Sequence, residues 1–167
     1  MPHIELPAGA PATLGEAFAH IGTVTAPGVM DMKVMSLVEA AAMTLYYQTA
    51  ETAEDPRVAE LLRRNGREEM LHGQRVALAI KAVSGEDFFV PMAEDNPYLQ
   101  GASGPIGEIT RDGLTKLSVG EFAGEALYET WASNTANAEA ARLFRLNGKE
   151  ETDHGNRLLE AAALLPG

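Results

Sequence analysis

Hydrophobic positions recur at helical spacing along most of the chain. Over residues 31–53 apolar side chains follow one another at intervals of three and four, and no residue there interrupts a helix. The same spacing returns over residues 56–83, 114–132 and 138–164. Short stretches of turn-forming residues separate the first of these segments from the second, and the third from the fourth. The pattern predicts an all-α protein with four long helices.

Two segments break this pattern. Residues 1–30 are rich in Pro, Gly, Ala and Thr, and a short helix is expected around residues 13–20. We interpret them as an N-terminal arm that packs on a helical body formed by residues 31–167, the alternative being an unattached tail. Residues 84–112 are interrupted repeatedly by Gly and Pro and are too long for a turn between neighbouring helices. They are expected to form a crossover between two pairs of helices.

The chain contains an internal repeat. Residues 31–83 fall without a gap on residues 113–165 when the sequence is shifted by 82 positions. Over residues 33–81, seventeen of 49 positions are identical to their counterparts, which coincidence does not explain. Each copy contains two helices joined by a turn. The repeat therefore predicts one αα-hairpin used twice, and a four-helix bundle built from the two hairpins.

Each copy carries a Glu-x-x-His motif in its second helix, Glu69 with His72 and Glu151 with His154. Residues three apart lie on one face of a helix, so each motif presents a carboxylate beside an imidazole. A single motif of this kind arises by chance on exposed helices. Two motifs at matching positions of a repeat indicate a shared site.

The first helix of each copy adds a glutamate within its apolar face, Glu39 or Glu121. Each lies as far before its turn as the motif glutamate lies after it, which places the two at one level of antiparallel helices. Four carboxylates buried together need roughly four positive charges, which two divalent cations supply. Mixed carboxylate and imidazole donors suit iron or manganese. The predicted metal ligands are Glu39, Glu69, His72, Glu121, Glu151 and His154.

Composition narrows the classes of function. A formal net charge of -11 argues against binding to nucleic-acid phosphates. The absence of cysteine excludes disulfides, iron–sulfur clusters and thiolate zinc sites. No apolar run approaches the length of a membrane span, and the N-terminus lacks the pattern of a secretory signal. We therefore expect a cytoplasmic protein that has neither a nucleic acid nor a membrane as partner.

With these motifs, residues 31–164 resemble the ferritin-like di-iron carboxylate superfamily, most closely the rubrerythrin-like proteins. The resemblance implies two iron ions, or manganese in one or both positions. It implies that the motif glutamates bridge the ions, that each histidine binds one ion, and that Glu39 and Glu121 are further ligands. It also implies a homodimer, with O2 or H2O2 and an external electron donor as partners.

Two departures separate the chain from that family. The rubredoxin domain that supplies electrons in many rubrerythrins needs cysteines and is therefore missing. Rubrerythrins carry a further glutamate three residues after the third-helix ligand, where this chain has Gly124. These departures make a peroxidase reaction of the rubrerythrin type a weaker inference than the metal site.

Three functions are compatible with such a site. The favoured hypothesis is a di-iron oxidoreductase that activates O2 or H2O2 as an oxidase or peroxidase. The alternatives are a ferroxidase that serves iron storage or detoxification, and a non-enzymatic bundle stabilised by metal. If an organic substrate is oxidised, the crossover residues Phe88, Phe89 and Met92 are a candidate wall for its channel.

Residues at matching positions beside the ligands raise further expectations. Related di-iron proteins use an acidic residue at the position of Glu68 and Glu150 to bind a metal-bound histidine across the bundle. The alternative for this pair is a solvated surface position. An asparagine near each motif either bonds a ligand carboxylate or serves helix packing. A tyrosine in the first helix of each copy is either a core aromatic or part of a redox or proton relay. An arginine after each motif forms a surface or an interhelical salt bridge. These residues are Asn65, Asn147, Tyr46, Tyr128, Arg75 and Arg157.

Overall fold

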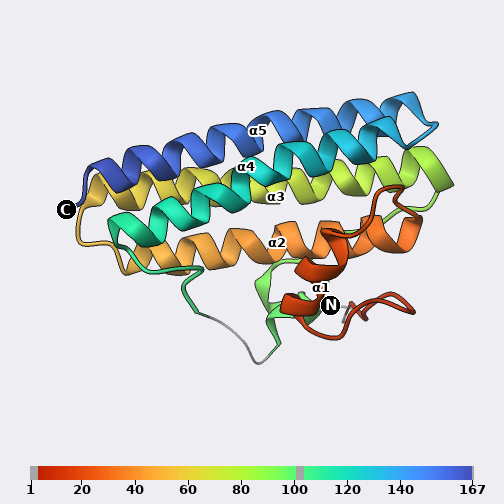
Figure 1. The fold of residues 1–167 in the computed structure, drawn as a ribbon. Helices are drawn as coiled ribbons and strands as arrows, with labels where there is room; N and C mark the ends of the chain where they lie inside the picture. Colours follow the sequence, from red (N-terminus) through yellow and green to blue (C-terminus); the bar gives the residue numbers. More distant parts are fainter. Residues whose placement is uncertain (1–3, 101–103, 167) are drawn as a thin grey trace.

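The protein is built from helices alone in the part of the chain that its computed structural model describes, residues 4–100 and 104–166 (Figure 1). Within those ranges there are five α-helices, two short 3-10 helices and no strand. The all-α prediction is confirmed. The elements are α1 (Leu14–Ile21), α2 (Val29–Glu51), α3 (Pro56–Ser84), η1 (Ala93–Asp95), η2 (Pro97–Leu99), α4 (Arg111–Ser133) and α5 (Ala138–Ala163).

The long helices begin and end at residues suited to those positions. The Asp55 carboxylate accepts a hydrogen bond from the Arg57 amide at the start of α3, and Asn137 accepts one from the Ala140 amide at the start of α5. Each satisfies a backbone N–H that has no partner within its helix. At the other end of α3, Gly85 has a φ of 78°, a left-handed conformation that glycine adopts without strain. The predicted boundaries agree with the observed helices to within three residues.

The four long helices lie side by side as two pairs (Figure 1). α2 packs along α3, and α4 packs along α5, each pair being joined by a short turn. The two pairs meet through α3 and α5. The backbones of α2 and α4 approach each other less closely, and a cavity lies between them. None of the helices in the described residues is both long enough and apolar enough to traverse a bilayer.

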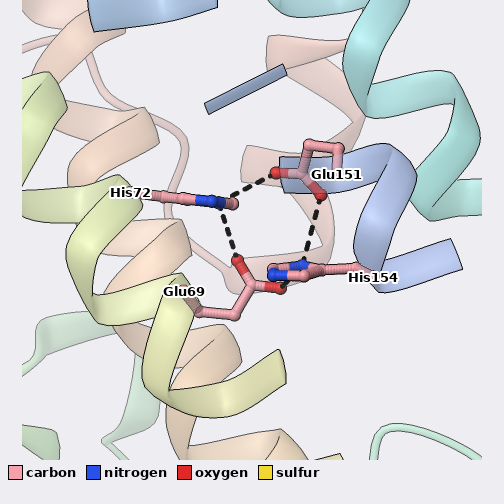
Figure 2. Close-up of side chains that lie close together, drawn as sticks. All are labelled: Glu69, His72, Glu151 and His154. Carbon is pink, nitrogen blue, oxygen red and sulfur yellow. Dashed lines mark ion pairs between the residues drawn. The ribbon is translucent and has the colours of Figure 1, made fainter. Parts of the chain in front are cut away.

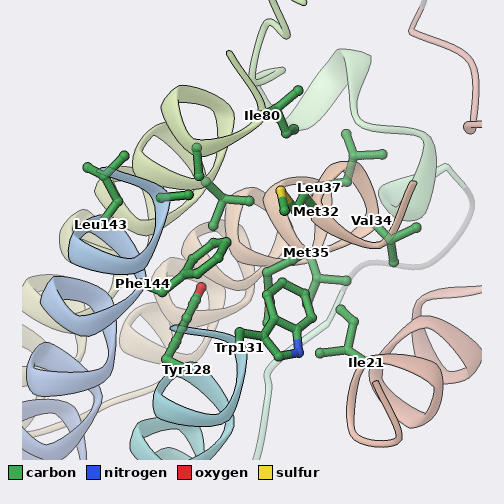
Figure 3. Close-up of a cluster of buried hydrophobic side chains, with 14 of the residues drawn as sticks. Ile21, Met32, Val34, Met35, Leu37, Ile80, Tyr128, Trp131, Leu143 and Phe144 are labelled. Atoms are coloured by element: carbon green, nitrogen blue, oxygen red, sulfur yellow. The ribbon is translucent and has the colours of Figure 1, made fainter. Parts of the chain in front are cut away.

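Two apolar clusters occupy opposite halves of the long helices. One joins the first turns of α2 to the end of α4 and contains Tyr128, Trp131 and Phe144, whose rings contact one another (Figure 3). The other contains Tyr46 and Leu62, together with residues near the end of α5. On each long helix the predicted ligands fall between these two clusters. The folding that buries the apolar clusters therefore also buries the polar residues between them.

The segment before α2 and the segment after α3 both attach to the long helices. α1 packs on α2 through the buried Ala17 and Ile21. The indole N–H of Trp131 donates to the Val24 carbonyl at 2.8 Å. In the crossover, the Asn96 side chain donates to the Leu37 carbonyl at 2.9 Å. These contacts cover the outer side of α2.

Candidate metal centre

Four of the six predicted ligands converge on one point in the protein interior. Glu69 and His72 come from α3, and Glu151 and His154 come from α5 (Figure 2). One potential ligand atom from each of the four lies within 4.8 Å of every other, and all four side chains are buried. The spacing within each motif puts its two side chains on one helical face, and the packing of α3 on α5 turns those faces toward each other.

Each imidazole faces both carboxylates of this group. The Nδ1 atom of His72 lies 3.1 Å from Oε1 of Glu151 and 3.4 Å from Oε2 of Glu69. The Nδ1 atom of His154 lies 3.3 Å from Oε1 of Glu69 and 3.6 Å from Oε2 of Glu151. Both Nδ1 atoms and Oε2 of Glu69 are nevertheless buried without a hydrogen bond of acceptable geometry.

Buried polar atoms without hydrogen bonds are costly, so they call for a partner from outside the chain. Here the atoms concerned are imidazole nitrogens and carboxylate oxygens that face a common centre. These are donor types that transition-metal ions bind. The residues present therefore fit the metal that the sequence predicts.

The remaining two predicted ligands come from the other two long helices. Glu39 belongs to α2 and Glu121 to α4, and both line the same cavity as Glu69 and Glu151. Oε2 of Glu121 lies 3.8 Å from Nδ1 of His154. Burial, followed by the negative charge of Glu69, raises the pKa of Glu39 well above its ordinary value. The structure thus brings together all six residues, with Glu39 and Glu121 outside the tightest group of four.

Two tyrosines bond these glutamates across the pairs of helices. The hydroxyl of Tyr46 on α2 donates to Glu121 on α4, and the hydroxyl of Tyr128 on α4 donates to Glu39 on α2. Burial is the largest cause that raises the pKa of both tyrosines, and the nearby glutamates add to it. Both hydroxyls therefore keep their protons and act as donors. The sequence indicated aromatic core positions but not these partners.

The outer nitrogen of each histidine is held by a glutamate of the other helix pair. Nε2 of His72 lies 3.0 Å from Oε2 of Glu150, and Nε2 of His154 lies 3.1 Å from Oε2 of Glu68. The predicted histidine–glutamate bond across the helices is confirmed in both copies. The alternative that Glu68 and Glu150 are solvated surface positions is wrong, because both are engaged with the buried histidines.

An arginine completes each of these contacts. Arg75 donates two hydrogen bonds to the Glu150 carboxylate, at 2.6 and 3.0 Å. Arg157 does the same to Glu68, at 2.7 and 3.0 Å. Of the two kinds of salt bridge predicted for these arginines, surface or interhelical, the structure shows the interhelical kind, and the two-point geometry holds each carboxylate in one orientation.

The asparagines do not bond a ligand carboxylate, which was one of the two roles that the sequence suggested for them. The Asn65 amide donates to the His154 carbonyl at 3.3 Å, and the Asn147 amide donates to the His72 carbonyl at 3.1 Å. Their side-chain oxygens accept from Arg157 and Arg75 respectively. The predicted bond to a ligand carboxylate is wrong, because the arginine and the histidine backbone already satisfy the amide.

This network determines which nitrogen of each histidine faces the centre with a lone pair. Burial alone would raise the pKa of Glu150, but hydrogen bonds from His72 and Arg75 outweigh it and hold that pKa at about 2. The Glu150 carboxylate is therefore ionised at neutral pH and accepts hydrogen bonds only. Nε2 of His72 must therefore keep its proton, so the neutral form of the imidazole, which metal binding requires, presents the lone pair of Nδ1 to the centre.

The charges of the site are balanced by protons when no cation is bound. Burial lowers the pKa of His154, but the charge of Glu69 and a hydrogen bond with Glu121 outweigh it and raise the pKa to about 10. Burial, then the charge of Glu69, raises the pKa of Glu151 well above its ordinary value. The group retains protons because it lacks positive charge. Divalent cations would take the place of those protons.

Glycines allow the helices to approach at the ligands. A Cβ atom on Gly124 would lie 2.9 Å from Cγ of Glu151, and one on Gly155 would lie 2.6 Å from the Phe122 ring. The lack of a side chain at Gly155 thus lets α5 approach Phe122 of α4 closely. The space beside residue 124 is taken by the Glu151 side chain.

The cavity between α2 and α4 has a volume of about 570 Å³ and reaches the carboxylates of the site. Its walls come from α1, α2 and α4, and from the segments that precede α2 and α4. The crossover residues Phe88, Phe89 and Met92 do not line it, and the side chains of Phe89 and Met92 are 80% and 54% exposed. The predicted channel wall is therefore wrong for these three residues, whereas Ile106, near the end of the crossover, does line the cavity.

No protein-family model, characterised protein or solved structure matches the chain. The chemistry of the site is therefore inferred from its own atoms. The buried cluster of Glu69, His72, Glu151 and His154, supported by ion pairs that fix both rings, forms an arrangement able to hold a metal ion. An open side next to the carboxylates allows a reactant to approach them.

Proposed function

We propose that the chain is a ferritin-like four-helix bundle that binds two divalent metal ions, iron or manganese. In this proposal hairpins formed by residues 31–83 and 113–165 are joined by the crossover 84–112, and residues 1–30 form the arm. The ligands would be Glu39, Glu69, His72, Glu121, Glu151 and His154. The observation that carries the proposal is the set of buried Nδ1 and carboxylate atoms that face one another without hydrogen bonds.

We further propose that the protein is an oxidoreductase that activates O2 or H2O2 with electrons from an external donor. A pair of iron ions would supply the redox equivalents and a template for the oxidant. The chain supplies orientation and exclusion of water. The glutamate–arginine pairs hold both imidazole rings, while the apolar clusters on either side keep the centre dry.

The tyrosines give the chain a way to hold protons at defined atoms. Tyr46 and Tyr128 each place a hydroxyl proton at a carboxylate oxygen of Glu121 or Glu39. Because their pKa values are raised, these hydroxyls remain protonated at neutral pH. Each therefore offers a proton next to the centre without becoming a competing anion.

The cavity favours an oxidoreductase over iron storage. Hydrated ferrous ions need polar groups along their entry route, because stripping water from a cation is costly. The walls of the cavity that reaches the carboxylates are mainly apolar. This lining suits O2 and uncharged molecules better than a stream of incoming cations.

Anaerobic titration of the metal-free protein with Fe(II) tests the proposal. We expect saturation at two ions per chain, followed by repeated turnover when O2 or H2O2 and a reductant are added. Glu69→Ala combined with Glu151→Ala should abolish tight binding. Glu160→Ala, which removes an exposed glutamate on the same helix as Glu151, should leave it unchanged.

Three results would count against this function. Uptake far beyond two ions per chain would indicate iron storage. Two bound ions without turnover would indicate a bundle that metal only stabilises. Binding that survives the double substitution would contradict the metal centre itself.

A further inference from the structure

We propose that the cavity between α2 and α4 binds a single apolar organic molecule with one end against the carboxylates of the site. The inference rests on the proposed function, because the bound molecule would be the organic substrate of the oxidoreductase. It goes further by naming a class of substrate and the surface that selects it.

The size and lining of the cavity match those of a small-molecule site. Its volume of about 570 Å³ lies in the range that is usual for pockets holding one organic ligand. Apolar side chains from α1, α2, α4 and the segment before α4 form the walls. They include Phe18, Ile21, Val38, Ile106, Leu117 and Leu127.

The carboxylates that line the cavity are those of the proposed metal centre. Glu39, Glu69, Glu121 and Glu151 all contribute to its lining. A molecule held by the apolar walls would therefore have one end beside the proposed metal ligands. Apolar walls with a few convergent polar groups are the usual composition of a substrate pocket.

Small residues keep this space open. Gly120, Ala123 and Gly124 line the cavity from α4, and Ala42 lines it from α2. A bundle that needed only stability would gain by filling such a space, because an internal void forfeits packing energy. The opening lies at the level of the site, where a reactant must enter.

The opposite side of the site is closed. There α3 packs directly on α5, and the arginine–glutamate–histidine contacts cross between the two helices. A reactant therefore approaches from the side of α2 and α4. Because the walls on that side are apolar, burial of hydrocarbon surface is what stabilises the bound molecule.

The volume and the walls of the cavity favour a small molecule over a second protein chain. Phe18 and Ile21 of α1, with Val24 after it, line one part of the opening. A protein partner would have to insert a side chain past them to the level of four carboxylates. A separate organic molecule reaches the same depth without that constraint.

A series of straight-chain alcohols of six to ten carbons, titrated into the protein by calorimetry, tests the inference. We expect binding to tighten about fourfold for each added methylene until the cavity is full, the factor that corresponds to about 0.8 kcal/mol per buried methylene. The metal-free protein should bind the alcohols as well, because the apolar walls do not depend on the ions.

Gly120→Phe is the blocking variant. A Cβ atom at Gly120 would have no neighbour within 4 Å, so the new side chain can enter the cavity without a backbone clash. We expect alcohol binding to weaken at least tenfold while the protein still takes up two metal ions. Gly15→Phe is the matched control, because residue 15 also has open space around it but does not line the cavity.

Ala126→Phe provides a second block from an exposed position of the same wall, should the first variant fail to fold. The inference is overturned if the wild-type protein binds no alcohol, if chain length has no effect, or if both folded variants bind as the wild type does. It is also overturned if Gly120→Phe dissociates a dimer without weakening alcohol binding. In that case a second copy of the chain, and not an organic molecule, would occupy the cavity.

The test separates this inference from the metal centre. Two bound metal ions without alcohol binding would overturn the apolar site and leave the metal centre intact. Alcohol binding with the expected chain-length dependence, but without metal uptake, would support the pocket and contradict the proposed oxidoreductase.

Discussion

The two pairs of helices, α2 with α3 and α4 with α5, are alike at the site and different at the surface. Each hydrogen bond around one histidine has a counterpart around the other. Yet 14 of the 23 residues of α2 are buried, against five of the 23 residues of α4. In the described part of the chain, α1, η1 and η2 pack on α2, whereas α5 is the element that packs closely on α4.

This difference shows where the repeat is under constraint. Both copies contribute the same atoms to one shared centre, so their sequences agree there. Their outer faces meet different surroundings, so matching positions have different environments. Substitutions at matching positions can therefore separate the shared part of the repeat from the part that has diverged.

The largest expected contrast concerns Trp131 and its counterpart Thr49. Trp131 is fully buried among Tyr128 and Phe144, so Trp131→Ala should lower the free energy of unfolding by about 3–5 kcal/mol. Thr49→Ala removes a hydroxyl that accepts from the Ile106 amide and should cost about 1 kcal/mol. Denaturant unfolding monitored by circular dichroism measures both. Equal losses would contradict the difference between the two outer faces.

A smaller contrast is expected between Leu37 and Val119. Leu37 on α2 is fully buried, and Val119, its counterpart on α4, is 66% exposed. Leu37→Ala should cost about 2–5 kcal/mol of unfolding free energy, and Val119→Ala less than about 0.5 kcal/mol. Chemical unfolding at one protein concentration gives both values. A large loss at Val119 would show that its side chain is covered in solution.

At the site itself the two copies should respond alike. Glu68→Ala and Glu150→Ala each remove the acceptor that orients one histidine and leave an arginine without its partner. Each should weaken metal binding by about 10–100-fold, and by the same factor in both copies. Glu129→Ala, which breaks an exposed ion pair with Arg145, is the control and should change nothing. Competition with a metal chelator provides the affinities, and unequal factors would contradict the symmetry of the centre.

The smallest effect concerns the capping residues that directly precede α3 and α5. Asp55 and Asn137 occupy matching positions, but only Asp55 titrates, and hydrogen bonds from Arg57 hold its pKa at about 2. Its ordinary pKa is about 4, so its stabilisation is complete above that pH and is lost as the pH falls toward 2. Asp55→Asn should therefore lower the Tm at pH 7 by an amount that vanishes near pH 2. A Tm difference that stays constant across thermal melts in this range would contradict the assignment.

Much of this arrangement could be predicted from the sequence. Helical periodicity located the four long helices, and the repeat paired the two Glu-x-x-His motifs. Equal distances from the turns also placed Glu39 and Glu121 near those motifs, because an antiparallel pair matches residues at equal distance from its turn. Each of these inferences depends on geometry within one helix or one pair.

What could not be predicted depends on how the two pairs dock. The tyrosine–glutamate bonds join α2 to α4, and no spacing within one helix reveals that register. The asparagines turned out to bond main-chain carbonyls of the opposite copy for the same reason. The cavity depends on the separation of two backbones and on which small residues face each other across it. Periodicity carries no information about that separation.

The contacts around the histidines also have a consequence for the order of assembly. They join residues separated by 72 to 92 positions, whereas the contacts within each hairpin lie closer together in the sequence. Contacts between sequence neighbours form fastest, so each hairpin is expected to form early and the centre last, when the hairpins dock. Metal ions would then stabilise the docked chain by mass action and leave the formation of each hairpin unaffected.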